Sequence, residues 1–243
     1  MIESYLILIY FCIIIFFQSI IGVGVLVLGT PFLLILKFNI VEIFFILLPI
    51  SICTSILNLL IINFSNKSLD KSTYKEFKKF FIICIPSIFF GLIILKLFGN
   101  YINFKLLVSL VIFFSIALVI LRDKIKFKIN FFRISILSIV GVIHGLTNSG
   151  GTLMSLALSV NNKKDYARLN TSFFYFILAM FQYFLTTIIF YDKFIFPNNY
   201  KLVIVLVIGV SLGNIFNHYL ESKSFKIMVY FLAFASSLIL IST

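Results

Sequence analysis

The stretch VGVIHGLTNSGGTLMSL, from Val140 to Leu156, is a polar interruption in a chain that is otherwise strongly apolar. It contains a histidine, an asparagine, several hydroxyl side chains and a Gly-Gly pair. Six consecutive small or polar residues, Thr147 to Thr152, have little reason to face lipid, because unpaired polar groups in hydrocarbon are costly. This pattern predicts that the stretch faces the protein interior or a water-filled cavity.

The chain around this stretch has the composition of an all-α integral membrane protein. Of its 243 residues, 62% are hydrophobic and 12% are charged, whereas about a quarter of the residues in a soluble domain are charged. Apolar runs of about 20 residues recur throughout, and each is long enough to cross the bilayer as a helix. A sliding hydropathy window predicts eight transmembrane helices, near 5–28, 41–63, 80–98, 104–121, 131–149, 169–190, 200–219 and 224–242.

Basic residues are distributed unevenly between the predicted connections. The connections 64–79 and 122–133 carry five Lys or Arg each, and the positive-inside rule assigns both to the cytoplasm, together with both termini if there are eight simple spans. Lys163, Lys164 and Arg168 are then expected on the opposite side, outside the spans. Retention of loop cations and attraction to anionic membrane lipid explain the net charge of +12, so we expect no nucleic-acid partner.

The chain also shows an internal repeat at an offset of 126 residues. This offset places Gln18 on His144, Gly22 on Asn148 and Gly24 on Gly150 without a gap. It predicts two four-helix membrane repeats, 1–121 and 134–243, joined by the basic connecting loop 122–133. In each repeat the first helix is interrupted or is followed by a re-entrant segment, because apolar character continues to Ile35 and Val160.

Glycines in a membrane helix allow two interpretations. Close packing of helices is the simpler one, and we prefer it for Gly91, Gly99, Gly209 and Gly213. The alternative is a break in the helix, which the segments 22–31 and 147–152 favour because their Gly and Pro residues lower helix propensity. A helix that starts at membrane depth directs its positive end at whatever occupies the adjacent cavity, which makes an anion site.

The charged residues within reach of these segments also favour an anion. Seven of the eight Asp and Glu residues fall in loops or termini, and Glu42 lies at a span edge, so a cation would lack a counter-charge. His144 either forms a hydrogen bond between helices or contacts the substrate. We expect binding by residues of the two interrupted segments, namely Gln18, Gly22, Gly24, Pro31, His144, Asn148, Ser149, Gly150, Gly151 and Thr152. No metal or cofactor is expected.

This pattern resembles the TauE/SafE family of bacterial membrane transporters over the whole chain. Each half of that family opens with a small-residue motif of the type Gly-x-Gly-Gly-Gly followed by a Pro. Gly22, Gly24 and Pro31 match the first motif, and Gly150 and Gly151 match the second. Val25, Leu26, Asn148 and Thr152 depart from the motif. The resemblance implies a multi-pass protein of the bacterial inner membrane that transports sulfite, a sulfonate or another organosulfur anion.

Three functions remain open at this point. The first is a secondary transporter, permease or exporter, of a small anion. The second is a membrane-embedded enzyme acting on a lipid-linked substrate, although no nucleophile with an orienting partner is visible in the sequence, so we do not expect an enzyme. The third is an accessory membrane subunit whose glycines only pack helices. The oligomeric state cannot be read from these residues.

Overall fold

The computed structural model describes residues 5–22, 24–64, 71–125, 134–151, 154, 164–194, 200–221 and scattered positions between 224 and 240. In these parts of the chain all regular structure is helical. Two short 3-10 turns also occur: Gly99–Tyr101 directly follows the helix that ends at Phe98, and Tyr191–Lys193 follows the helix that ends at Ile189. The described α-helices are α1 (Tyr5–Ile21), α2 (Val25–Ile35), α3 (Ile40–Phe64), α4 (Lys71–Phe98), α5 (Phe104–Ile125), α6 (Ile134–Thr147), α8 (Lys164–Ile189) and α9 (Tyr200–Tyr219).

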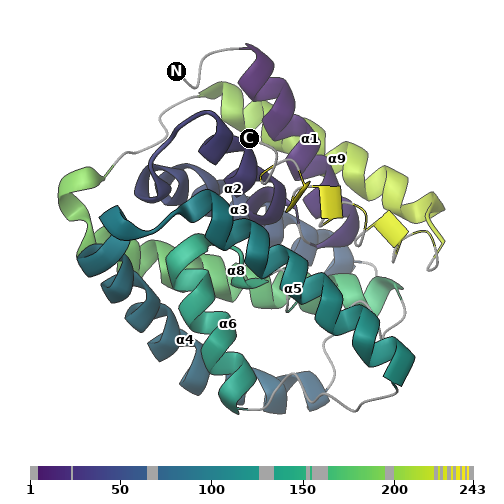
Figure 1. The fold of residues 1–243 in the computed structure, drawn as a ribbon. Helices are drawn as coiled ribbons and strands as arrows, with labels where there is room; N and C mark the ends of the chain where they lie inside the picture. Colours follow the sequence, from purple (N-terminus) through teal and green to yellow (C-terminus); the bar gives the residue numbers. More distant parts are fainter. Residues whose placement is uncertain are drawn as a thin grey trace.

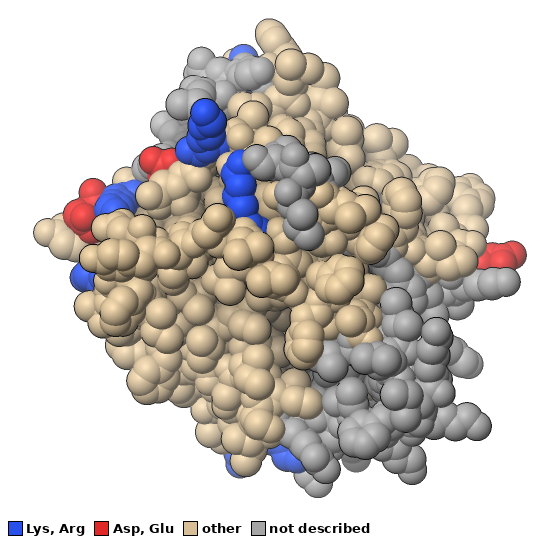
Figure 2. All heavy atoms as spheres, viewed as in Figure 1, with Lys and Arg blue, Asp and Glu red and all other residues tan. Residues whose placement is uncertain are grey.

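Four described segments are long and apolar enough to cross a membrane: Ile40–Ile62, Glu76–Tyr101, Asp165–Ile189 and Tyr200–Tyr219. They coincide with four of the predicted spans. Many large apolar side chains on their outer faces are exposed, which suits contact with lipid. In Figure 2 most of the described surface is uncharged, and the Lys, Arg, Asp and Glu residues gather at the upper left, with a few at the right and lower edges. The protein is therefore a multi-pass membrane protein.

Several predicted boundaries are wrong. The first and fifth spans are too long as predicted, because α1 and α6 have only 17 and 14 residues before the chain breaks. The predicted connection 64–79 is partly helical, since α4 begins at Lys71, and α5 continues to Ile125 into the predicted connection 122–133. Lys and Arg are good helix formers, so both helices extend past the apolar run. Most of the predicted span 224–242 lies outside the described residues.

Glu42, the carboxylate predicted at a span edge, takes part in capping the start of α3. The side-chain oxygen of Asn39 accepts a hydrogen bond from Val41 N at 3.0 Å, and Glu42 accepts one from Asn39 N at 3.1 Å. This reciprocal arrangement is a capping box, which satisfies two backbone donors at the helix start. Glu42 therefore stabilises a helix end at this position.

Glycines pack two pairs of helices closely. On α9, a Cβ at Gly213 would lie 2.6 Å from Phe16 O of α1, and one at Gly209 would lie 3.0 Å from Cys12 O. A Cβ at Gly91 of α4 would overlap Val142 O of α6. The packing interpretation is confirmed for these three glycines. It is wrong for Gly99, whose added Cβ would meet side chains of Leu95 and Phe104 and no backbone of another helix.

Contacts between residue pairs show the direction of each helix. Helices α1, α3 and α9 run one way, and α4, α6 and α8 run the opposite way. Figure 1 shows α1 beside α9 on one side of the molecule and α4 beside α6 on the other, with α8 between them. Helix α1 is parallel to α9, as the pairs Gly209 with Cys12 and Gly213 with Phe16 show. Helices α4, α6 and α8 are parallel to one another, as shown by Gly141 with Cys84, Gly145 with Ile88, Phe77 with Phe173 and Phe81 with Phe181. Helix α3 is antiparallel to α8, as shown by Phe45 with Tyr183 and Asn58 with Arg168, and Asn217 near the end of α9 contacts Arg168 near the start of α8, which agrees with the opposite course of α9 and α8 in Figure 1.

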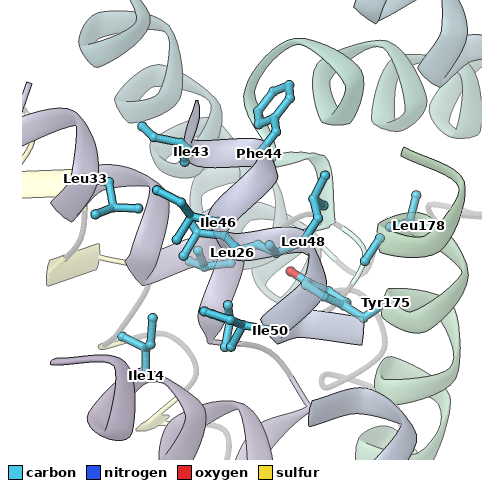
Figure 3. Packing of buried hydrophobic residues seen from close by; sticks show 14 of the residues in the cluster. Ile14, Leu26, Leu33, Ile43, Phe44, Ile46, Leu48, Ile50, Tyr175 and Leu178 are labelled. Carbon is cyan, nitrogen blue, oxygen red and sulfur yellow. The ribbon is translucent and has the colours of Figure 1, made fainter. Parts of the chain in front are cut away.

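Helices α3 and α8 form the centre of the molecule and pack extensively against each other. Both are buried on several faces, and their core side chains interlock with those of α2. Figure 3 shows Tyr175 of α8 reaching toward Leu48 and Ile50 of α3 and Leu26 of α2. Any polar group on the inner faces of α3 and α8 is consequently shielded from lipid.

Candidate functional site

The first candidate segment is a sharp break between α1 and α2. Gly22 has a φ of 84°, which is the left-handed region that favours glycine. Its N–H donates to Gln18 O at 2.7 Å and closes the last turn of α1. The chain then reverses, because Gly24 lies against the backbone of Ile14 and Gln18, with an added Cβ 2.8 Å from Ile14 O.

Helix α2 runs back along α1 after this break. The Tyr10 hydroxyl of α1 donates to Leu28 O at 2.7 Å, and its ring stacks on Phe32 with 3.6 Å between ring centroids. Helices α1 and α2 thus form a hairpin. Gly29 and Pro31 do not cause the interruption, since both lie buried inside α2.

The second candidate segment breaks α6 in the same way. Asn148 has a φ of 65°, and its N–H donates to His144 O at 2.9 Å. An added Cβ at Gly150 would overlap Val140 O and lie 2.7 Å from His144 N. Each of these residues is 126 positions after its counterpart in the first break. Asparagine replaces Gly22 at this point because it tolerates left-handed backbone better than other side chains do.

The two breaks differ in how their polar side chains are bonded. At the first break, Gln18 Oε1 accepts a hydrogen bond from Val25 N at 3.0 Å, in the manner of an N-cap for α2. Gln18 Nε2 donates to Ser51 O and to the hydroxyls of Ser51 and Ser55 at 3.1–3.3 Å. Asn58 Nδ2 donates to Gln18 O at 3.3 Å. Protein groups therefore occupy both ends of the Gln18 amide.

At the second break the buried polar atoms are left open. His144 and Asn148 are both fully buried, and neither side chain has a partner with full hydrogen-bond geometry among the described residues; the backbone of Asn148 is the polar group that acts on the imidazole. Gln182 Nε2 donates to His144 O at 3.0 Å, while its Oε1 also lacks a described partner. Because buried polar groups are nearly always bonded, these atoms are suited to a ligand or to water.

The other predicted site residues lie at varying distances from this cluster. Ser149 donates to Thr147 O at 3.2 Å, directly beside Asn148. Gly151 lies against the ring of Tyr175, where an added Cβ would be 2.7 Å from the hydroxyl oxygen. Pro31 lies on α2, away from the break that precedes it. Thr152 lies outside the described residues.

The sequence interpretation missed Arg168. It was expected in a loop, but it lies inside α8 with 6% of its surface exposed. Its guanidinium donates to the side-chain oxygens of Asn58, Asn214 and Asn217. A hydropathy window excludes a charged residue from a span, so this boundary was drawn one turn too late. The spacing of Arg168 from the buried Ser172 and Tyr175 would have placed it on their face of the helix.

Among the described residues, no group of three His, Cys, Asp or Glu side chains could hold a metal ion. What the described parts of the chain provide is two helices broken within the membrane region, with buried amide, hydroxyl, imidazole and guanidinium groups around them. Discontinuous helices inside an apolar bundle are typical of secondary membrane transporters.

The comparisons with known proteins agree with this class. The family model described as sulfite exporter TauE/SafE matches residues 6–240, and the chain therefore belongs to the TauE/SafE family. Membership makes the protein a membrane transporter of a family that exports sulfur-containing anions. No curated protein and no solved structure matches the chain.

Proposed function

We propose that the protein is a secondary transporter of a small sulfur oxyanion, such as sulfite or a sulfonate, and that the anion binds at the second break. The observation that carries this proposal is the difference in bonding between the two breaks. The Gln18 amide is fully used by the protein, whereas His144, Asn148 and Gln182 present buried atoms without described partners. An oxyanion supplies acceptors for the amide and imidazole donors among these atoms.

Backbone geometry supports the same location. Gly150 and Gly151 are helical directly after the second break, and the N-terminus of a helix favours negative charge. Glycine at these two positions lets backbone N–H groups approach a ligand closely. We include Thr152 in the proposed site by its position in the sequence. Gln18, Gly22, Gly24 and Pro31 form the first hairpin, which we assign mainly to holding the scaffold.

We further propose that the two halves are inverted repeats that exchange access to the site. The support is threefold: the backbone geometry recurs at an offset of 126, α1 and α6 run in opposite directions, and α1 pairs with α9 as α6 pairs with α4. Inverted repeats with broken helices permit alternating access by rocking one unit against the other. No nucleotide-binding motif occurs in the sequence, so an ion gradient or the anion's own gradient supplies the driving force.

Helix directions revise the proposed topology. Because α6 and α8 run the same way, we infer that both helices begin on the same side of the membrane. This places the basic connections near 64–79 and 122–133 on one side with Lys163, Lys164, Lys223 and Lys226, and leaves five of the 20 Lys and Arg residues on the other. Those five are Lys37, Lys96, Lys105, Lys193 and Lys201.

The positive-inside rule then makes the first side cytoplasmic in a bacterial inner membrane. The basic connections keep their predicted location. Both termini move to the outer face, in contrast to the prediction from eight simple spans. The uneven distribution of basic residues becomes stronger under this topology, because the three cations near 163–168 now lie on the basic side.

The test is exchange of labelled sulfite by the purified protein in liposomes, with Asn148→Gly as the variant. Glycine keeps the left-handed backbone at this position and removes only the side-chain amide. We expect the variant to fold normally and to exchange sulfite about tenfold more slowly or worse. A tenfold change corresponds to about 1.4 kcal/mol of lost binding free energy. Normal exchange by Asn148→Gly would rule out the second break as the site. Absence of exchange by the wild-type protein for every sulfur anion would favour an accessory role.

A further inference from the structure

Arg168 is a buried cation that the proposed site does not yet use. Its guanidinium donates to Asn217 Oδ1 at 3.3 Å, to Asn58 Oδ1 at 3.4 Å and to Asn214 Oδ1. Its Nε is buried and has no hydrogen-bond partner among the residues that the structure describes. The three contacts are with neutral amides, so they orient the guanidinium without cancelling its charge. Asp165, one turn earlier on α8, is the acidic residue whose charge acts on it.

The Arg168 cluster adjoins the first break. Asn58 Nδ2 donates to Gln18 O at 3.3 Å, and Asn217 Nδ2 donates to Ile20 O at 2.7 Å, so both amides connect the guanidinium to the last turn of α1. Gly22 lies against Arg168 itself, because an added Cβ there would be 3.1 Å from Arg168 O. The cation is therefore held where the chain turns back toward the start of α2.

Arg168 also begins a polar stripe on α8. Residues at alternating spacings of four and three lie on one face of a helix, and in α8 this face is buried along its whole length. The residues of the stripe are Arg168, Ser172, Tyr175, Ala179, Gln182 and Thr186. The hydroxyls of Ser172 and Thr186 and Oε1 of Gln182 lack described partners.

The stripe connects the two breaks. Eighteen residues separate its ends, which corresponds to roughly 27 Å of helix and is close to the thickness of the hydrocarbon core. Gly22 contacts α8 at Arg168 and Thr171, Gly151 contacts it at Tyr175, and Gln182 donates to His144 O. Apart from Ala179, a row of buried polar side chains thus runs along α8 from the guanidinium to the proposed binding site.

We propose that Arg168 binds the transported oxyanion at the cytoplasmic end of this stripe, before the anion reaches the second break. The inference rests on the proposed function and names its charge-recognising residue. A planar guanidinium matches the paired oxygens of a sulfite or sulfonate group and remains charged throughout the physiological range. A buried cation adds little to stability compared with an apolar residue of similar size, whereas it attracts an anion strongly.

A purely structural role makes different predictions. In that role Arg168 ties α8 to α3 and α9, and its charge is incidental. The two roles separate when charge and hydrogen bonds are changed independently. Arg168→Gln removes the charge and keeps some hydrogen bonding. Asn217→Ala removes the hydrogen bonds to the guanidinium and to Ile20 O and keeps the charge. Asp165→Asn removes the negative charge that acts on Arg168 while leaving the arginine in place.

The experiment measures stabilisation of the detergent-purified protein by sulfite, methanesulfonate and chloride, since a ligand that binds only the folded state raises the denaturation temperature. We expect Arg168→Gln to weaken the apparent sulfite affinity by about tenfold or more, as loss of a charge-assisted hydrogen bond does. We expect Asn217→Ala to retain the response and Asp165→Asn to bind sulfite several times more tightly. Lys193→Gln, at an exposed cation just beyond the opposite end of α8, is the charge control and should not change the affinity.

Each result supports or contradicts the assignment. A folded Arg168→Gln variant with wild-type sulfite affinity would overturn it. If Arg168→Gln does not fold, Asp165→Asn decides, because unchanged affinity in that variant means that Arg168 does not contact the anion. The proposed function fails separately, when the wild-type protein shows neither stabilisation nor exchange with any sulfur anion.

Discussion

Gln18 Oε1 accepts a hydrogen bond from the backbone N–H of Val25 at 3.0 Å, across the break that separates α1 from α2. The same amide donates to Ser51 and Ser55 on α3. One side chain thus caps the helix after the break and fastens the hairpin to the centre of the molecule. The equivalent position in the second half is His144, whose ring has no partner with full hydrogen-bond geometry among the described residues.

Replacing Gln18 should therefore mainly affect stability. Gln18→Leu leaves Val25 N and the Ser51 and Ser55 hydroxyls without their partner, and we expect a loss of about 3 kcal/mol from the missing cap and the unpaired buried groups. Gln18→Glu keeps the acceptor for Val25 N and should lose less. Denaturation temperatures from gel filtration of heated samples measure both. A Gln18→Leu protein as stable as the wild type would show that the capping geometry is incidental.

Substitutions at the two left-handed positions should differ in a defined order. Gly22→Ala forces a Cβ into left-handed backbone, at about 1–2 kcal/mol, and also places it 3.0 Å from Thr171 Cβ. Asn148→Ala carries a smaller penalty, because Asn already has a Cβ, and Asn148→Gly should be close to wild type. The same heating assay ranks the three variants. A ranking with Asn148→Gly as the least stable would contradict the assigned backbone conformation.

Glycine packing between α4 and α6 should tolerate no added methyl group. Gly91→Ala directs a Cβ at the backbone oxygen of Val142, and the backbone of α6 cannot easily move away from it. We expect the free energy of unfolding to fall by about 1–3 kcal/mol, or the protein to fail to assemble. Gly99→Ala is the matched control, because its nearest neighbour is the flexible Leu95 side chain at 3.2 Å. Yield and monodispersity after purification compare the two. Equal behaviour would mean that α4 and α6 are farther apart than described.

The α1–α2 hairpin predicts which side of the membrane each end faces. Single cysteines at Tyr5 and Lys37 should react with an impermeant maleimide from the same side, and one at Tyr219 from the opposite side. The native cysteines Cys12, Cys53 and Cys84 are first replaced, so that only the introduced cysteine can react. All three test positions are exposed. Under the proposed orientation, Tyr5 and Lys37 label from outside the cell. Labelling of these two from opposite sides would make α1 and α2 a single span.

The sequence was sufficient for the membrane class and for the positions of both breaks. The offset pairs Gly22 with Asn148, and both residues have positive φ. The offset works because a reversal of the chain needs specific residue types, which leave a trace in otherwise uniform apolar sequence. The TauE/SafE resemblance, based on the same residues, is confirmed by the family match.

The bonding within the site could not be predicted in the same way. Gln18 and His144 occupy matched positions, but whether a side chain is satisfied depends on Ser51 and Ser55, which are over 30 residues from Gln18 in sequence. Arg168 was misplaced because hydropathy treats a charge as a boundary, whereas three asparagines from α3 and α9 solvate this one inside the bundle. Long-range polar contacts of this kind have no local sequence signal.

The pairing of α1 with α9 has a consequence for biosynthesis. Helix α1, which is synthesised well before α9, packs against it, and α6 packs against α4 of the other half. The first half cannot complete its packing while it is the only part synthesised. Helix α1 therefore lacks its packing partner until Gly209 and Gly213 of α9 have been synthesised and inserted. During translation the face of α1 that later meets these glycines is covered by lipid or by the insertion machinery. Maturation therefore ends with a late docking step that closes both halves together.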